Sequence, residues 1–150
     1  MTAVQPIPAR VAAIKERHED YWRSDEALKE AVAAWGAEGR VNDCGVFAGY
    51  EAETVAKSGR ATAEVGVYKV REGVFVHCCH FMTATAGSGY APSVWGATPH
   101  ATAKQARLAG IAELLERIGA YGSEGDNAAR EEVRQMIRQL QREIDQPSLF

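Results

Sequence analysis

Residues 74–82, Val-Phe-Val-His-Cys-Cys-His-Phe-Met, are the stretch that most constrains the fold of this chain. The segment is short and rich in β-branched and aromatic residues. In an extended strand Val74 and Val76 point to one side, while Phe75 and Phe81 point to the other. A strand covered on one side would alternate apolar with polar residues. We therefore expect a strand in the middle of a sheet, covered on both faces.

Two further strands are expected around this one. Residues 61–71 form the strand before it, and Glu72-Gly73 is a two-residue hairpin turn of the kind that tolerates positive φ. Residues 83–89 are small and polar and predict a loop. Residues 90–95 then form the third strand, and Pro92 favours an edge position because it cannot donate to a ladder.

The segment that precedes these strands is the least informative part of the sequence. Residues 41–50 contain apolar residues and two glycines, which fits either a short strand or an irregular segment. Residues 51–57 fit one or two helical turns, closed by Ser58-Gly59.

Two helices are expected before the strands. Pro8 can serve as the first residue of one that runs to about Arg23, because its missing N–H would be an orphan there anyway. Ser24 is a good N-cap for the second, which ends near Gly36.

Two more helices are expected after the strands. Thr102 caps the first, with Gln105 as the reciprocal member of a capping box. Asp126 or Asn127 caps the last, which stops before Pro147 because the residue ahead of a proline avoids the helical region. Its apolar residues repeat at helical spacing: Val133, Met136, Ile137, Leu140 and Ile144.

This order predicts an α+β domain, with a three-stranded or four-stranded antiparallel sheet and helices before and after it. We expect residues 1–145 to form a single domain that begins with a loose arm over residues 1–7. Residues 146–150 would then be a separate short linear motif.

Composition limits the location and the partners of the chain. Its 46% hydrophobic and 25% charged residues are ordinary for a soluble protein. The net charge of −3 argues against composition-driven nucleic-acid binding, although it allows a local basic patch. No membrane span or signal peptide is expected. Three cysteines do not make a disulfide framework, which favours free thiols in a reducing cytoplasm.

His77, Cys78, Cys79 and His80 are the residues that could bind a metal. Neighbours on a strand point to opposite faces, so one metal cannot collect all four, and the sequence has no Cys-x-x-Cys. A nucleophilic pair of His77 and Cys79 is the catalytic alternative. Nothing in the sequence marks a helix N-terminus aimed at either thiol, and no Gly-x-Ser-x-Gly, phosphate-binding loop or His-Glu-x-x-His occurs. We expect structural thiols, no metal, no cofactor and no enzymatic activity.

The last helix carries four arginines spaced four residues apart, here named the arginine row: Arg130, Arg134, Arg138 and Arg142. Each step drifts by about 40° around the helix axis, so the row slants beside the apolar stripe. Glu131 can pair with Arg134. The row is therefore either an ordinary solvated face or a contact to nucleic-acid phosphates or to an acidic partner surface.

The final five residues, Gln-Pro-Ser-Leu-Phe at 146–150, form what we name the tail motif. It resembles the pentapeptide with which bacterial replication and repair proteins bind the DNA polymerase sliding clamp, roughly Gln-Leu-Ser/Asp-Leu-Phe. The resemblance implies that Gln146 and Ser148 make polar contacts, while Leu149 and Phe150 fill an apolar pocket as anchors. Pro147 stands at the position where these pentapeptides usually have Leu. The alternative is that Leu149 and Phe150 fold back onto the core of the chain.

Residues 61–118 resemble small modules of phage and plasmid accessory proteins. The α-β-β-β-α order is also similar to that of double-stranded RNA-binding domains, but residues 83–89 lack the basic side chains that such a domain needs.

Three classes of function follow. The first is a non-enzymatic, cytoplasmic accessory protein of a phage or plasmid that docks on the bacterial sliding clamp and modulates replication or another DNA process. The second is an anti-defence inhibitor, such as an anti-CRISPR or anti-restriction protein. The third is a small Cys/His enzyme or metal protein.

Overall fold

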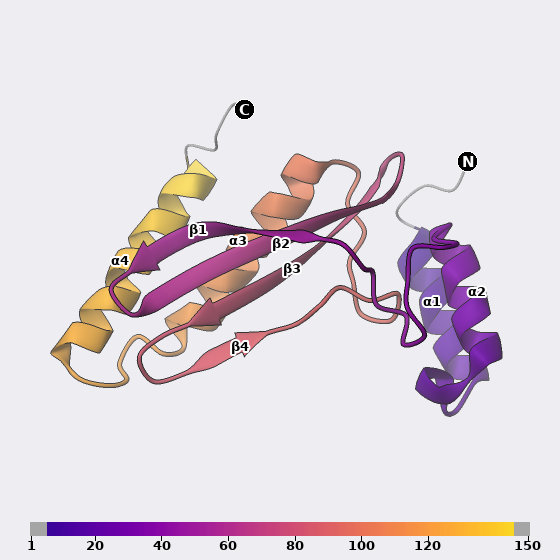
Figure 1. Cartoon of the computed structure of the whole chain (residues 1–150), viewed down its shortest axis with the longest axis horizontal. Coiled ribbons are helices and arrows are strands. Elements are labelled where there is room, and N and C mark those ends of the chain that lie inside the picture. The colour runs from indigo at the N-terminus through magenta and orange to yellow at the C-terminus, as the bar shows by residue number, and fades with distance from the viewer. Residues whose placement is uncertain (1–5, 146–150) are drawn as a thin grey trace. The chain divides into compact units, whose positions relative to one another are not determined.

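The computed structural model describes residues 6–145 and confirms the α+β architecture (Figure 1). The described chain contains four α-helices, a short 3-10 turn and a four-stranded antiparallel sheet with the strand order β1-β2-β3-β4. The elements are α1 (Pro6–Arg17), η1 (Tyr21–Arg23), α2 (Asp25–Trp35), β1 (Glu51–Ser58), β2 (Ala61–Arg71), β3 (Val74–Met82), β4 (Gly87–Gly89), α3 (Ala103–Gly119) and α4 (Asn127–Asp145). Among residues 6–145, no helix is long and apolar enough to cross a membrane.

The chain divides into two compact units. The described part of unit 1 comprises residues 6–50, 67–77 and 91–106, and that of unit 2 comprises residues 51–66, 78–90 and 107–145.

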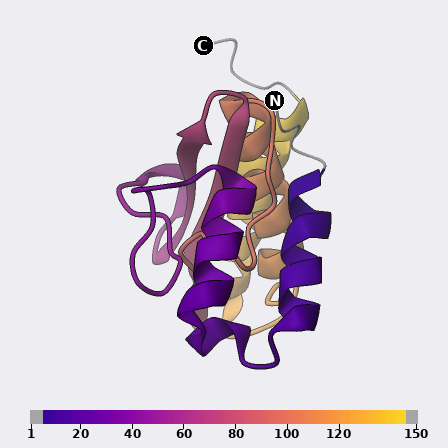
Figure 2. The same cartoon turned by 90° about the vertical axis from the view of Figure 1, so that its right-hand side faces the viewer.

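Unit 1 is built around helices α1 and α2, which lie side by side (Figure 2). The side of α2 that faces the core is lined by small residues and ends in Trp35, of which 1% is exposed. The Trp35 indole donates a hydrogen bond to the Val94 carbonyl at 2.9 Å and stacks edge-on against Phe47 at 5.4 Å. The large indole is therefore buried with its polar atom satisfied.

Helix α1 begins at Pro6, two residues earlier than predicted, and Ile7 is fully buried in the core of unit 1. Residues 6 and 7 thus belong to the helix rather than to a loose arm. The helix also ends earlier than predicted, at Arg17, and is followed by the separate turn η1.

The predicted helix caps are confirmed. Ser24, Thr102 and Asp126 each accept a hydrogen bond from the backbone N–H three residues later, at 3.1, 3.1 and 2.7 Å. Gln105 completes a capping-box arrangement by accepting from the Ala101 N–H at 3.2 Å. Each cap satisfies a donor that the first turn of a helix leaves without an intrahelical partner.

Strand β3 lies between β2 and β4, as the sequence predicts for residues 74–82. Val76, Cys78 and Cys79 are at most 1% exposed, and Phe81 is 5% exposed. The turn before β3 is the predicted Glu72-Gly73, where Gly73 has a φ of 75°.

Strand β1 corrects the prediction of a helical segment over residues 51–57. Glu, Ala and Lys dominate this stretch and favour a helix locally. The structure instead makes it an edge of the sheet, with Val55 and Ala56 buried. Tertiary pairing thus overrides local propensity.

Strand β4 is also displaced from its predicted position. It covers residues 87–89 in the expected loop, and Gly89 pairs with His80. A Cβ at Gly89 would lie 2.1 Å from the His80 ring, so this close approach requires glycine. The predicted strand at 90–95 forms instead an irregular segment with an isolated bridge from Ser93 to Val46.

Replacing Phe81 with alanine tests the place of β3 in the core. We expect the free energy of unfolding to fall by about 3–5 kcal/mol, because the ring is buried and packs 5.7 Å from Tyr121. The neighbouring Met82 is 60% exposed, so Met82→Ala is the matched control and should change stability by less than about 0.5 kcal/mol. Urea unfolding measures both values. Equal losses for the two variants would contradict this assignment.

Candidate functional site

The tail motif at residues 146–150 lies outside the described residues, and the structure describes the chain up to the end of α4. The candidate site is therefore considered from α4, the element that leads into the motif. Three of the five predicted apolar positions of α4 are buried, namely Val133, Met136 and Leu140. Ile137 is half-buried, and Ile144 is 38% exposed.

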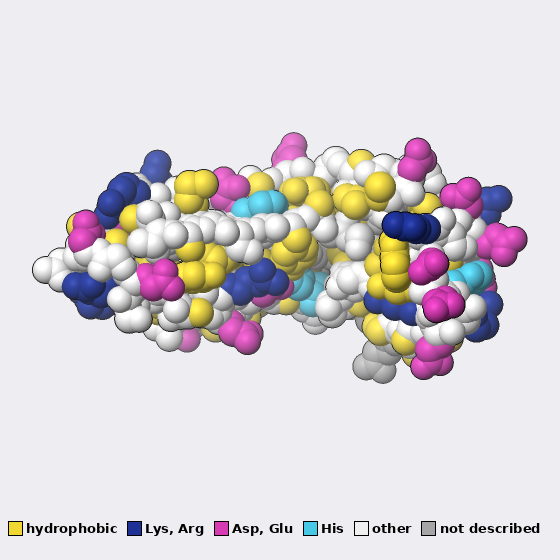
Figure 3. Space-filling view, turned by 90° about the horizontal axis from the view of Figure 1, so that it is seen from below, with side chains coloured by type: hydrophobic (Ala, Val, Ile, Leu, Met, Phe, Trp, Pro, Cys, Tyr) yellow, Lys and Arg dark blue, Asp and Glu magenta, His cyan; other side chains and the backbone are white. Residues whose placement is uncertain are grey.

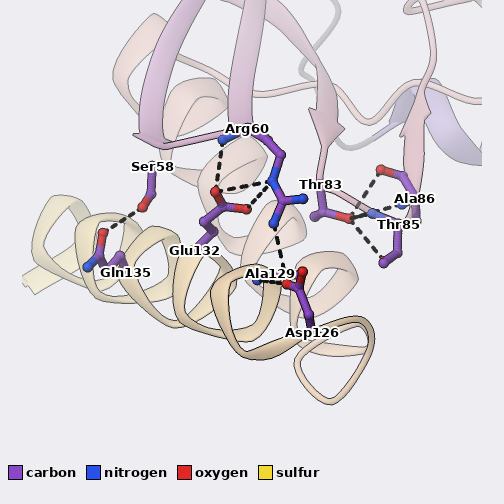
Figure 4. A network of polar contacts seen from close by, with 9 residues as sticks. All are labelled: Ser58, Arg60, Thr83, Thr85, Ala86, Asp126, Ala129, Glu132 and Gln135. Atoms are coloured by element: carbon purple, nitrogen blue, oxygen red, sulfur yellow. Dashed lines mark hydrogen bonds and ion pairs between the residues drawn. The ribbon is translucent and has the colours of Figure 1, made fainter.

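Polar side chains beside this apolar stripe bind the hairpin formed by β1 and β2. The Gln139 amide makes two hydrogen bonds to the backbone of Lys57, accepting from its N–H and donating to its carbonyl, both at 2.9 Å. Gln135 accepts from the Ser58 hydroxyl at 2.5 Å (Figure 4). One residue of the helix thus provides the donor and acceptor that a neighbouring strand would otherwise provide.

The turn of the same hairpin is held at the beginning of α4 (Figure 4). Glu132 accepts from the Arg60 backbone N–H at 3.1 Å and from its guanidinium at 3.2 Å. Arg60 also lies 3.5 Å from Asp126, the N-cap of α4. The Ala129 backbone N–H, assisted by Arg60, lowers the pKa of the Asp126 carboxyl below its usual range.

Thr83 organises the short turn that separates β3 from β4. Its hydroxyl accepts from the backbone N–H groups of Ala86 and Thr85, at 3.0 and 3.3 Å (Figure 4). The Thr85 hydroxyl in turn donates to Glu124 at 3.3 Å, in the segment just ahead of α4.

Arg107 on α3 holds the last part of α4. Its guanidinium binds the Glu53 carboxylate of β1 at 2.9 Å and the Glu143 carboxylate of α4 at 3.3 Å. The hydrogen bonds that Arg107 donates to the Glu53 carboxylate are the main cause that raises the pKa of Arg107 above its usual range. Arg107, itself held by Glu53 of β1, therefore binds α4 at Glu143, three residues before Gln146 in the sequence.

Three members of the arginine row contact other residues of α4 or of the turn before it. Arg134 and Arg138 both bind Glu131, at 2.8 and 3.0 Å, and Arg134 is the main cause of the lowered pKa of the Glu131 carboxyl. Arg130 binds the Gly125 carbonyl and the Asn127 side chain. Within residues 6–145, Arg142 makes no ion pair.

The i, i+7 pair between Glu131 and Arg138 is one that the sequence analysis missed. One carboxylate thus offsets two of the four charges. Acidic and basic side chains are also interspersed on the molecular face drawn in Figure 3.

His77 and Cys79 each have a different partner. His77 Nδ1 lies 2.9 Å from His100 Nε2, and burial together with the charge of His77 lowers the pKa of His100. The Cys79 thiol donates to Glu113 at 2.9 Å. Burial, with Glu113 as the second cause, raises the pKa of Cys79 to about 12. A thiol that stays protonated is a poor nucleophile and a poor metal ligand.

Glu113 is the centre of a polar cluster that sequence analysis did not find. It also accepts from the Tyr90 hydroxyl at 2.8 Å and pairs with Arg117 at 3.0 Å. Arg117 lies over the Tyr90 ring, 5.3 Å from its centre. The i, i+4 spacing of Glu113 and Arg117 was the one local sequence pattern that could have indicated this cluster. Among the described residues, no three His, Cys, Asp or Glu side chains form a group that could hold a metal ion.

Comparison with known proteins finds no family model that matches the chain, no similar curated protein and no similar solved structure.

The double hydrogen bond of Gln139 can be tested against a neighbouring glutamine. Gln139→Ala should lower the free energy of unfolding by about 1–2 kcal/mol, because two modest hydrogen bonds are lost. The Lys57 amide should also exchange faster with deuterium. Gln141 is exposed on the same helix, and Gln141→Ala should change neither value. Unaltered exchange at Lys57 in Gln139→Ala would contradict the bond.

Thiol labelling tests the assignment of the three cysteines. In the folded protein Cys44 is exposed, whereas Cys78 and Cys79 are buried and the Cys79 thiol is held protonated. We expect one thiol per chain to react rapidly with Ellman's reagent at pH 8, and three to react in denaturant. A Cys44→Ser chain should show almost no rapid reaction. Rapid labelling of that variant would show a reactive thiol at 78 or 79.

Proposed function

We propose that this chain is a non-enzymatic accessory protein of a phage or plasmid that docks on the bacterial DNA polymerase sliding clamp. The tail motif is the contact, and docking modulates replication or another DNA process. The observation that carries the proposal is the motif itself, Gln-Pro-Ser-Leu-Phe, placed directly after a helix that is fixed to a folded unit.

The chemistry of the motif suits a peptide that binds in a groove. The Gln146 amide can donate and accept hydrogen bonds in a small polar pocket, and the Ser148 hydroxyl can do the same. Leu149 and Phe150 are the apolar anchors, and such anchors usually carry most of the binding energy of an interface. Pro147 supports an extended peptide, because the residue ahead of a proline avoids helical backbone angles.

The described contacts of α4 support this use of the motif. Gln139 binds the backbone of Lys57, and Glu143 binds Arg107. Both lie within seven residues of Gln146, so the helix that leads into the motif has a fixed position in unit 2. A peptide that is ordered when it binds loses conformational freedom, so we expect a dissociation constant of about 1 μM.

Titration of purified clamp into the chain by calorimetry tests this function. The wild-type chain should bind, and the double variant Leu149→Ala with Phe150→Ala should bind at least about 30-fold more weakly, since one anchor is worth about 2 kcal/mol. Pro147→Leu should tighten binding, because it restores the residue usual in such peptides.

Arg142→Ala is the control from the adjacent turn of α4. It should leave the affinity for the clamp nearly unchanged at physiological salt. Arg142→Ala and the double variant should both keep the wild-type melting temperature. The proposal fails if the wild-type chain does not bind, or if the double variant binds equally well. A lowered melting temperature in the double variant would instead place Leu149 and Phe150 in the core.

A further inference from the structure

An exposed tryptophan lies in unit 1, in the turn η1 that joins α1 to α2. The Trp22 side chain is 59% exposed, although large aromatic residues are usually well covered. Its ring packs edge-on against Tyr21 at 5.1 Å, and Tyr21 lies 4.8 Å from Trp95. We name this surface the aromatic turn, with Trp22 as its outermost ring.

The backbone around Trp22 is held by hydrogen bonds. The Arg23 N–H donates to the Asp20 carbonyl at 2.9 Å, and the Ser24 N–H donates to the Tyr21 carbonyl at 3.2 Å. The Lys15 ammonium lies 5.2 Å from the centre of the Tyr21 ring, on the side of α1. Trp22 is therefore presented on an ordered support, and a partner would lose little conformational entropy in ordering it.

Carboxylates flank the exposed ring on both sides in the sequence. Glu19 and Asp20 precede it, and Asp25 and Glu26 follow it; all four are exposed. In the part of the chain that the structure describes, none of their side chains forms an ion pair. Asp25 and Glu26 lie in the first turn of α2 and stabilise it through their interaction with the helix dipole. Arg23, which is also exposed, follows Trp22 directly, so residues 19–26 carry four carboxylates and one guanidinium and keep a net charge of −3.

The nearby Glu30 shows the contrast. Its carboxylate binds Arg17 at 2.5 Å and His18 at 2.6 Å, and these partners lower its pKa, with Arg17 as the larger cause. Arg17 at the end of α1 and His18 directly after it thus reach Glu30. The four carboxylates that neighbour Trp22 in the sequence form no such ion pair within residues 6–145 and can therefore bind a partner.

We propose that the aromatic turn is a docking site for an arginine-bearing segment of a partner protein. A guanidinium is planar and weakly hydrated, so it can stack on the indole face while it binds a carboxylate with two parallel hydrogen bonds. A lysine ammonium lacks that planar fork. Nucleic acid is disfavoured here, because its phosphates would face four carboxylates and only one arginine in residues 19–26. This site is separate from the tail motif and does not depend on it.

The test uses a probe peptide, acetyl-(Gly-Arg)₃-amide, with acetyl-(Gly-Lys)₃-amide for comparison. Binding is measured by calorimetry and by the change in tryptophan fluorescence at low salt. The arginine peptide should bind more tightly than the lysine peptide. Trp22→Leu keeps an apolar side chain but removes the aromatic face, and it should weaken arginine-peptide binding about fivefold or more, the range of a cation–π contact. It should also abolish the preference for arginine.

Charge variants separate this site from general attraction to an acidic protein. Asp20→Asn with Glu26→Gln should weaken binding of the arginine peptide. Glu38→Gln with Asp43→Asn removes the same net charge from two other exposed positions of unit 1 and should have a much smaller effect. The chain with Leu149→Ala and Phe150→Ala should bind the peptide as the wild type does, which keeps this inference distinguishable from clamp docking.

Three results would overturn the proposal. Equal affinity for the two peptides, unaffected by Trp22→Leu, would show unspecific charge attraction. Tighter binding of a single-stranded oligonucleotide, lost in Trp22→Leu, would identify the ring as a base-stacking platform. Concentration-dependent sedimentation that disappears in Trp22→Leu would make a second copy of this chain the occupant.

Discussion

The two hydrogen bonds between the Gln139 amide and the backbone of Lys57 are the interaction on which the arrangement of unit 2 depends. An edge strand presents unpaired N–H and C=O groups, which are costly when covered and prone to pair with other chains when exposed. At Lys57 the Gln139 side chain binds both backbone groups, at 2.9 Å each. Gln135 and Glu132 bind the same hairpin, one and two helical turns earlier respectively.

These polar contacts define the register of α4. Glu132, Gln135 and Gln139 are spaced by three and four residues, so they share one side of the helix, next to the buried stripe of Val133 and Met136. A slip by one turn would move the helix by about 5.4 Å and break every one of these bonds. Apolar burial holds the helix against the strands, and the polar contacts of Glu132, Gln135 and Gln139 select its position along them. A fixed position for α4 also fixes Asp145, the last described residue before the tail motif in the sequence.

The sequence predicted those features that depend on neighbouring residues. The caps at Ser24, Thr102 and Asp126 and the turn at Gly73 follow from local chemistry, and the structure confirms them. Burial of the central strand followed from its apolar residues on both faces.

The features that were missed depend on distant residues. Strand β1 has local helix formers and becomes a strand because it pairs with β2, while Gln139, 82 residues away from Lys57, binds the backbone of that residue. Strand β4 forms where Gly89 lets the backbone approach the His80 ring. The pairing of Cys79 with Glu113 joins residues 34 apart, and no spacing rule connects them. For the candidate site, the arginine row and the tail motif could be read from the sequence, but the role of Glu131 in binding two arginines could not.

Nuclear magnetic resonance of the isotopically labelled chain, recorded with and without purified sliding clamp, tests the central claim most directly. If the tail motif docks while α4 stays in place, signals of residues 146–150 should shift or broaden. The amide of Lys57, the amide of Arg60 and the side-chain amide of Gln139 should keep their positions. Changes at Lys57 or Gln139 without changes in residues 146–150, or no change anywhere, would contradict the account.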